Sequence, residues 1–513
     1  MNPLFFASSY VLTLFLHNIG ELSLNKLIIP LLLILIFSFS IFLISLFLFK
    51  NKQDASFFSS LFVILFFSYH DASTILEKHY LTGDHILLPL WIALLIFSFF
   101  LTKKIPVKRK SDINQFLRII SFIIVIVPLL GIIRYQVFQR GHTTIKSRLK
   151  LPVAQKTDSL PDIYYILPDS YSAPTIFPRY FDYDNSSFVQ YLTEKGFYFA
   201  SQSTSNYPKT FLSLASTLNM EYLDYLSNNK NSSDQTIVNP LIEDSNVLVV
   251  LKSLGYHYYQ IGSWWWPTQN NRNADEVYTV QKQNHLGFDE FTYIIINSTP
   301  INPILKRLSP AAVIGESNED KRSIILYQFK TFPEVAKKPG PKFVFAHIIA
   351  PHGPYVFNKN CEFTTQKETD LRTDEVNYAN QVSCINIKLK ETIETILKVS
   401  SAPPIILLQT DEGAQFLAEK LTPPDSWGKA STELLKTKFP ILSAYYLPGV
   451  SPSSLYETMT PVNSFRTIFN LYFGTNLPLL PDKNYIFPDM EHLYEFEDVT
   501  EKINKNFITP PDL

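Results

Sequence analysis

Cysteine is scarce in this 513-residue sequence, in which only Cys361 and Cys384 occur. So few cysteines exclude a disulfide-rich scaffold and a zinc site built from several thiolates. A single disulfide remains possible if this part of the chain is exported. Charge is also sparse, with 18% charged residues and a net charge of −1. These averages combine two unlike regions, so they do not describe either one.

Roughly the first 135 residues are dominated by Leu, Ile and Phe, whereas the remainder has the composition of a soluble domain. A spanning helix needs about 20 apolar residues. Only one of the apolar segments reaches that length without its flanks. A cleaved signal peptide accounts poorly for the N-terminus, because further apolar segments follow it. We expect about five membrane helices, at residues 4–16, 27–49, 56–69, 86–101 and 117–133.

Lysine and arginine indicate the orientation of these segments. Lys50 and Lys52 follow the second segment, and five basic residues lie at 103–110, between the fourth and the fifth. The positive-inside rule places both loops in the cytoplasm, and an odd number of spans then places the later domain outside. Basic residues at 134–150 argue the other way, but long domains are translocated largely regardless of such charge. We therefore expect a multi-pass protein of the plasma or inner membrane with an extracytoplasmic domain.

Beyond a basic linker at 136–160, strand-like and helix-like patterns alternate over 161–478, and a Pro-rich tail at 479–513 follows. Such alternation predicts an α/β domain with a mainly parallel central sheet and helices on both faces. The expected strands are 163–167, 197–200, 256–261, 343–349, 405–409 and 441–447. The expected helices are 185–195, 245–254, 374–399 and 462–473.

Carboxylates follow two of the predicted buried strands. Asp169 comes after the apolar run 163–167, and Asp411 and Glu412 come after the run 405–409. Taken alone, either acidic turn is most often a solvated turn. Ligands of open parallel sheets bind beyond the carboxyl ends of the strands, and carboxylates gathered there repel one another unless a cation lies between them. A metal site is therefore the better interpretation of the two turns together.

Thr210 lies where a polar loop passes into an apolar helical pattern. At a helix start, free backbone N–H groups and the positive end of the helix dipole stabilise an anion, and a metal lowers the pKa of a hydroxyl. Thr210 is thus a candidate nucleophile. A helix N-cap is the alternative role, and the spacing alone does not decide between them.

These residues carry a family resemblance. Asp169 after a strand, Thr210 at a helix start and the Asp411-Glu412-Gly413 turn occur in the order seen in the alkaline phosphatase/sulfatase superfamily. The layout resembles membrane-bound enzymes similar to lipoteichoic acid synthase and the phosphoethanolamine transferases, which have five N-terminal spans and an extracytoplasmic sulfatase-like domain. The resemblance implies an alkaline phosphatase-like fold. It also implies a divalent metal, with Thr210 taking up a phosphoryl-bearing group, and as metal ligands Asp169, Thr210, Asp411 and Glu412.

The resemblance implies further substrate-binding residues. His352, which follows the strand 343–349, resembles the family's substrate-binding histidine and can donate to a phosphate oxygen or protonate a leaving group. Trp266 and Arg272 lie where the family has an aromatic and arginine clamp, and Arg272 can grip a phosphate. Exposed tryptophans near a membrane can equally be interfacial anchors. His347, inside the strand, is expected to be a core histidine.

Two departures from the family pattern shape the functional prediction. The family's Asp-His pair is Asp411-Glu412 here, and an all-oxygen site favours Mn²⁺ or Mg²⁺, with Ca²⁺ and Zn²⁺ possible. The Cys/Ser-x-Pro-x-Arg motif of classical sulfatases is absent at Thr210.

We therefore expect a membrane-anchored, metal-dependent phosphotransferase or phosphodiesterase. Its expected partners are the lipid bilayer, a phospholipid or lipid-linked donor and a surface-glycan or lipid acceptor, but no nucleic acid. The alternatives are an inactive sulfatase-like domain that serves as a binding module of an envelope assembly, or a sulfuric-ester hydrolase.

Overall fold

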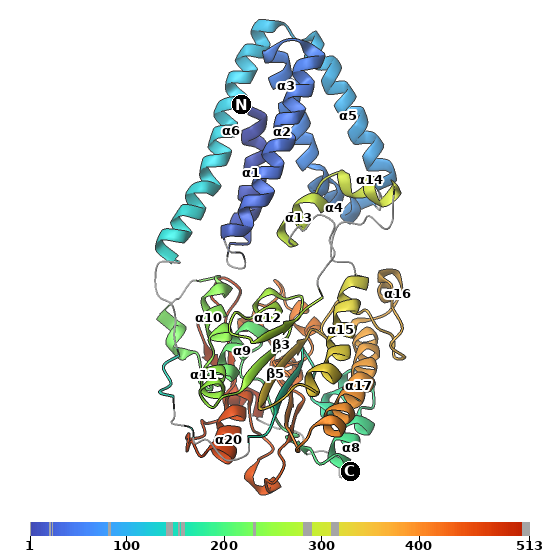
Figure 1. Cartoon of the computed structure of the whole chain (residues 1–513). Helices are drawn as coiled ribbons and strands as arrows, with labels where there is room; N and C mark the ends of the chain where they lie inside the picture. The colour runs from blue at the N-terminus through green and yellow to red at the C-terminus, as the bar shows by residue number, and fades with distance from the viewer. Residues whose placement is uncertain are drawn as a thin grey trace. The chain divides into compact units, whose positions relative to one another are not determined.

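The computed structural model describes residues 2–19, 22, 24–80, 84–139, 147–151, 154, 160–228, 232–280, 290–308 and 318–504. Within it the chain forms two compact units (Figure 1). The first comprises Met1–Thr143 together with Lys282–Ser317, and the second comprises Thr144–Gln281 together with Asn318–Leu513.

The first unit is helical. Its elements are α1 (Asn2–His17), η1 (Leu24–Leu27), α2 (Ile28–Phe49), α3 (Lys52–Phe67), α4 (Tyr69–Tyr80), α5 (Asp84–Lys104), α6 (Val107–Arg134), η2 (Tyr135–Gln139), α13 (Glu290–Asn297) and α14 (Ile301–Leu308).

Three stretches of the first unit are long and apolar enough to cross a membrane: Leu24–Phe49, Ile86–Lys104 and Lys108–Val137. The pair Lys52–Phe67 and Tyr69–Leu76, bent by 42°, makes a fourth if it is one span. Helix α1 has only 16 residues. The N-terminal region with apolar helices is thus confirmed, while the count of five spans stays a prediction.

Helix α13 belongs to the first unit although it is encoded between two parts of the second. Phe291 and Ile295 of α13 are buried in one hydrophobic cluster with residues of α1 and α6. The ring of Phe291 meets that of Phe15 edge-on, with 5.8 Å between centroids. The boundaries expected from the sequence did not separate this segment.

The second unit contains a seven-stranded sheet in the order β2-β7-β6-β1-β5-β3-β4. Strands β6, β1, β5, β3 and β4 run parallel, whereas β7 is antiparallel to both β6 and β2. The mainly parallel sheet is confirmed. The strands are β1 (Ile163–Pro168), β2 (Tyr198–Phe199), β3 (His257–Ile261), β4 (Glu276–Tyr278), β5 (Lys342–Ile348), β6 (Ile405–Gln409) and β7 (Ser443–Tyr446).

Helices cover both faces of this sheet. Their bounds are α7 (Phe177–Tyr180), α8 (Ser186–Glu194), α9 (Thr210–Asn219), α10 (Asn239–Glu243), α11 (Asn246–Ser253), α12 (Trp266–Gln269), α15 (Asn318–Ala336), α16 (Gln366–Asp370), α17 (Asp374–Val399), α18 (Phe416–Glu419), α19 (Thr432–Lys438), α20 (Pro461–Phe473) and α21 (Thr500–Asn504). A two-stranded ribbon, β8 (Tyr485–Ile486) with β9 (Glu497–Asp498), lies in the C-terminal tail.

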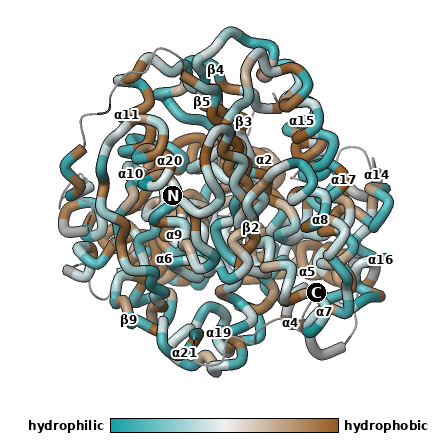
Figure 2. The backbone as a smooth tube through the Cα atoms, turned by 90° about the horizontal axis from the view of Figure 1, so that it is seen from below, coloured by the Kyte–Doolittle hydropathy of each residue, from teal (hydrophilic) through white to brown (hydrophobic). Residues whose placement is uncertain are grey.

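Alternate residues of the central strands face two separate cores, because successive side chains of a strand point to opposite faces. Ile163, Tyr165 and Leu167 of β1 pack with helices α9, α11 and α20. Tyr164 and Ile166 pack on the other face with α8, α15 and α17. Figure 2 shows hydrophobic colour along β5. All six residues of β1 are buried, which explains its unbroken apolar sequence.

A disulfide joins Cys361 to Cys384 of α17. It links the loop after β5 to the helix that packs behind the sheet. Disulfides persist in oxidising compartments and are rare in the cytosol.

Candidate active site

Three buried side chains meet at the carboxyl ends of three adjacent parallel strands. Asp169 follows β1, His347 is the sixth residue of β5, and Asp411 follows β6. One potential ligand atom from each lies within 4.8 Å of the other two. Strand β1 lies between β5 and β6, so the sheet itself brings together residues up to 242 positions apart. The two predicted acidic turns are thus neighbours in space.

The carboxylates of this cluster are under electrostatic strain that a cation would relieve. Burial raises the pKa of Asp411, and the negative charge of Asp169 raises it further. Burial acts in the same direction on Asp169, but His352, His347 and the Ser170 hydroxyl outweigh it and lower its pKa. Asp411 Oδ2 has no hydrogen-bond partner among the described residues. A buried carboxylate oxygen without a donor is what a metal ligand requires, so the donor set fits a divalent cation.

His347 is held in place from several sides. Its Nδ1 lies 2.8 Å from the Thr268 hydroxyl, and its Nε2 lies 3.2 Å from Asp169 Oδ2. The Gln328 amide donates to its backbone carbonyl at 2.7 Å. The Trp265 ring meets the imidazole edge-on at 5.7 Å. When Nδ1–H donates to Thr268, Nε2 keeps a lone pair directed toward the carboxylates, as metal-binding histidines require.

Replacing Thr268 should therefore weaken metal binding without touching a ligand. Thr268→Ala removes the acceptor of Nδ1–H, and loss of such an orienting group costs about 10- to 100-fold in metal affinity. Thr268→Ser keeps the hydroxyl and should retain the wild-type affinity. Competition with a chromophoric chelator measures both. Equal affinity in Thr268→Ala and wild type would show that His347 does not bind the ion.

Glu412 has a cationic partner that the sequence did not reveal. Its Oε1 lies 3.2 Å from Nζ of Lys438, and both side chains are buried. Burial raises the pKa of Glu412 to about 8, although the Lys438 ammonium acts in the opposite direction. Gly413 permits the close approach of the two segments, because a Cβ there would lie 2.2 Å from the Lys438 carbonyl oxygen. Glu412 therefore lies beside the cluster with its Oε1 in contact with the buried Lys438 Nζ.

Thr210 is the first residue of α9, and Lys209 occupies the N-cap position without a side-chain capping bond. Thr210 is therefore not the N-cap residue of α9. The Thr210 hydroxyl hydrogen-bonds to Asp411 and lowers the pKa of that carboxyl. Lys209 pairs with Asp425 at 2.9 Å. Burial lowers the pKa of Lys209, but Asp425, Glu412 and Asp169 together raise it, so a cation lies next to the threonine.

His352 lies in the turn after β5, close to the cluster. Its backbone N–H donates to the Asp169 carbonyl at 3.1 Å, and its half-buried ring lowers the pKa of Asp169 through its charge. The Gln381 side chain donates to the His352 carbonyl at 2.8 Å. The expected role of His352 in substrate binding stays a prediction.

Arg272 and Trp266 are placed differently from the expected clamp. Both side chains are more than half exposed. The Arg272 guanidinium pairs with Glu243 and Asp244, and within the described residues no hydrogen bond or ion pair joins it to the cluster. Of the tryptophan triplet, Trp265 contacts His347. A clamp role for Trp266 and Arg272 remains a prediction.

The ligand atoms gathered by the fold differ from the expected all-oxygen set. His347 supplies an imidazole, and Glu412 contacts Lys438 through Oε1. Glu412 Oε2, like Asp411 Oδ2, has no hydrogen-bond partner among the described residues, so Glu412 as a metal ligand stays a prediction. The expectation that His347 is only a core histidine missed its place at the sheet edge. Nitrogen in the donor set improves the match to Zn²⁺ relative to Mg²⁺, so the basis for favouring Mn²⁺ or Mg²⁺ is weaker than the sequence indicated.

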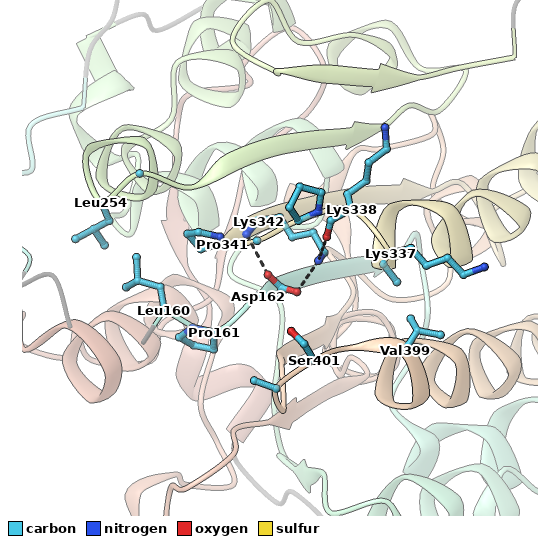
Figure 3. Close-up of a pocket in the computed structure, with 15 residues that line it drawn as sticks. Leu160, Pro161, Asp162, Leu254, Lys337, Lys338, Pro341, Lys342, Val399 and Ser401 are labelled. Atoms are coloured by element: carbon cyan, nitrogen blue, oxygen red, sulfur yellow. Dashed lines mark hydrogen bonds and ion pairs between the residues drawn. The ribbon is translucent and has the colours of Figure 1, made fainter. Parts of the chain in front are cut away.

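A cavity of about 610 Å³ lies at the opposite ends of the same strands (Figure 3). Asp162, directly before β1, pairs there with Lys342 of β5 at 2.6 Å, and Lys338 pairs with Glu276 at 2.9 Å. Parallel sheets bind ligands at the carboxyl ends of their strands. The amino-end cavity therefore does not compete with the cluster as an active site.

Several solved structures resemble this chain. The C-terminal periplasmic domain of EcEptC from Escherichia coli is 12% identical with a TM-score of 0.42, and the match covers 68% of this chain and 96% of that one. The integral membrane protein lipooligosaccharide phosphoethanolamine transferase A (EptA) from Neisseria meningitidis is 14% identical with a TM-score of 0.40, covering 92% of both chains.

No curated protein sequence matches the chain. The sequence pattern of the family described as Sulfatase matches residues 161–439, more than half of the chain. That span contains the cluster, the helix that begins at Thr210, and the Glu412–Lys438 pair. The chain therefore belongs to the sulfatase family.

Proposed function

We propose that this protein is a membrane-anchored, metal-dependent phosphotransferase or phosphodiesterase that uses Thr210 as its nucleophile. One observation carries the proposal: the Thr210 hydroxyl, at the start of α9, hydrogen-bonds to Asp411 in a buried cluster that needs a cation. Asp169, His347 and Asp411 would hold a divalent ion, and Glu412 would stay paired with Lys438. When bound, such an ion lowers the pKa of a neighbouring hydroxyl and offsets charge that develops on phosphoryl oxygens.

The residues of the chain suit the two halves of a group transfer. Thr210 Oγ gives up its proton to Asp411 and forms a bond to phosphorus while the ester bond to the leaving alcohol breaks. His352, in the turn after β5, donates the proton that the leaving oxygen takes up. In the second half an acceptor hydroxyl, or water, attacks phosphorus and passes its proton to His352. The Thr210–phosphorus bond breaks at the same time, and Thr210 Oγ takes back the proton held by Asp411. A lipid-linked or surface-glycan phosphate fits this scheme, since the domain follows membrane helices.

Turnover with and without metal tests the proposal. Metal-stripped full-length protein should be inactive on bis(p-nitrophenyl) phosphate, and Zn²⁺, Mn²⁺ or Mg²⁺ should restore hydrolysis. p-Nitrophenyl sulfate serves as the control for a sulfuric-ester hydrolase and should give no product, because Thr210 stands where formylglycine formation needs Cys or Ser. No turnover of any ester with any ion would favour the binding-module alternative.

We also propose that the second unit lies outside the cytoplasm. The basic loops at 50–52 and 103–110 support this orientation, and so does the Cys361–Cys384 disulfide. Alkaline phosphatase fused after residue 513 should be active in cells, whereas GFP at the same place should stay dark if the protein is exported unfolded. Strong GFP fluorescence with inactive phosphatase would reverse the orientation.

A further inference from the structure

We propose that a groove between α2 and α6 binds one acyl chain of the membrane lipid on which the enzyme acts. The groove has a volume of about 780 Å³ and is lined by residues 24–35 on one side and 129–137 on the other. Ten of its twelve lining residues are apolar, and the exceptions are Asn25 and Gln136. This inference rests on the proposed function, because it names the substrate class of the same enzyme.

The walls of the groove belong to candidate membrane spans. Leu24–Phe49 and Lys108–Val137 are two of the three stretches long and apolar enough to cross a membrane. Both α2 and α6 pack against α1 (Figure 1). Gly131 of α6 lies against Leu16, where a Cβ would come within 2.7 Å of that side chain. Such contact with α1 fixes the two walls, so the groove between them is a built feature rather than a gap between loose helices.

The length of the groove and the position of its polar residues match one leaflet of a bilayer. At 1.5 Å per residue, the wall from 24 to 35 is roughly 18 Å long, a little over half of the ~30 Å hydrocarbon core. The two polar lining residues lie at the same end, where the first wall begins and the second ends. An occupant must therefore be apolar over one leaflet and polar at its tip. A lipid with its chain in the groove has this form.

The polar end of the groove carries positive charge. Lys26 follows Asn25, and Arg134 precedes Gln136 by two residues; both side chains are exposed. Basic side chains at the membrane surface attract anionic headgroups. The other ends of α2 and α6 adjoin the cytoplasmic lysines 50 and 108, so the polar end is extracytoplasmic by the same rule. In the orientation proposed above, a headgroup phosphate held here would be on the same side of the membrane as the second unit.

Photocrosslinking of full-length protein in nanodiscs tests the groove directly. The probe is a phosphatidylglycerol whose acyl chain carries a diazirine. Crosslinks should concentrate on residues 24–35 and 129–137, and Leu31→Trp or Leu129→Trp, which fill the groove, should reduce them about tenfold. Leu90→Trp changes an exposed residue of α5 outside the groove and should leave them unchanged. Crosslinks spread evenly over all exposed helix faces would show bulk lipid only and overturn the inference.

Activity separates this inference from the proposed function. With a lipid phosphodiester, the groove-filling variants should raise KM about tenfold, while hydrolysis of bis(p-nitrophenyl) phosphate stays at the wild-type rate and shows that the variants are folded. Unchanged KM for the lipid in both variants would contradict the groove. Failure of the wild type on every phosphodiester would contradict the proposed function alone, since the crosslinks report binding without turnover.

Discussion

Thr210→Ala should lower phosphodiester turnover by at least about 10⁴-fold, the scale on which an enzyme loses its nucleophile. The hydroxyl that this change removes faces Asp411, and the neighbouring side chains offer no hydroxyl at the same helix start. The melting temperature should change little, because Lys209 rather than Thr210 is at the N-cap. Even a lost cap costs only about 1 kcal/mol. Steady-state rates together with the melting temperature of full-length protein measure the two effects.

Two matched variants complete the comparison. Thr210→Ser keeps a hydroxyl at the start of α9 and should retain measurable turnover. Ser213→Ala removes a hydroxyl one turn along the same helix, where it donates to the Tyr207 carbonyl at 3.0 Å, and should leave the chemistry intact. Full activity in Thr210→Ala would end the nucleophile proposal. A large drop in melting temperature without loss of turnover would point to a structural role instead.

Asp411→Asn should change stability in opposite directions with and without metal. In the metal-free protein, Asp169 and Asp411 are buried like charges, so removing one of them should raise the melting temperature. In wild type, a metal at 100 times its Kd adds about 2.7 kcal/mol to the free energy of unfolding. The variant should gain far less, because it loses a ligand, and its turnover should fall by more than about 100-fold. Melting curves across a metal titration record whether the variant is more stable than wild type without metal and less stable with it.

The neighbouring carboxylate provides the control. Glu412→Gln places a neutral side chain of the same shape beside Lys438, close to the protonated form that a pKa of about 8 favours at neutral pH, and Lys438 still donates to the Gly413 carbonyl at 2.8 Å. The stability of the metal-free protein should therefore change little. The added stability from metal should survive, since Asp169, His347 and Asp411 remain. If Glu412→Gln abolished the metal response while Asp411→Asn preserved it, Glu412 would be the ligand. A full response in both variants would mean that the cluster binds no cation.

The buried strands and their acidic ends were predictable because each leaves a local signature. An unbroken apolar run that stops at Asp169 or Asp411 is visible in the sequence, and the parallel order of strands brings those ends together. The predicted fold class and superfamily are confirmed on this basis. Helix α17 matches its predicted range of 374–399 because its apolar residues recur every three or four positions.

The sequence could not show which distant residues the tertiary structure brings into contact with one another at the site. His347 lies in a strand whose seven residues are all buried, so nothing local distinguishes it from a core residue. Its orienting hydroxyl, Thr268, is 79 positions away, and Lys438 reaches Glu412 from helix α19. One signal would have indicated that His347 belongs to the cluster. It is a histidine near the carboxyl end of a buried strand that is adjacent in the sheet to strands with acidic ends.

The interrupted second unit imposes an order on biosynthesis. Phe291 and Ile295 complete a hydrophobic cluster whose other members include α1 and α6, yet the ribosome reaches them only after β1, β3 and α9 have been made. The hydrophobic cluster of the first unit is therefore incomplete until Thr144–Gln281 of the second unit has been synthesised. By the same logic, a fragment cut to begin after residue 143 would keep these two apolar side chains and lose the surface that shields them. Because residues 282–317 belong to the first unit, a single cut in the chain cannot separate the two units.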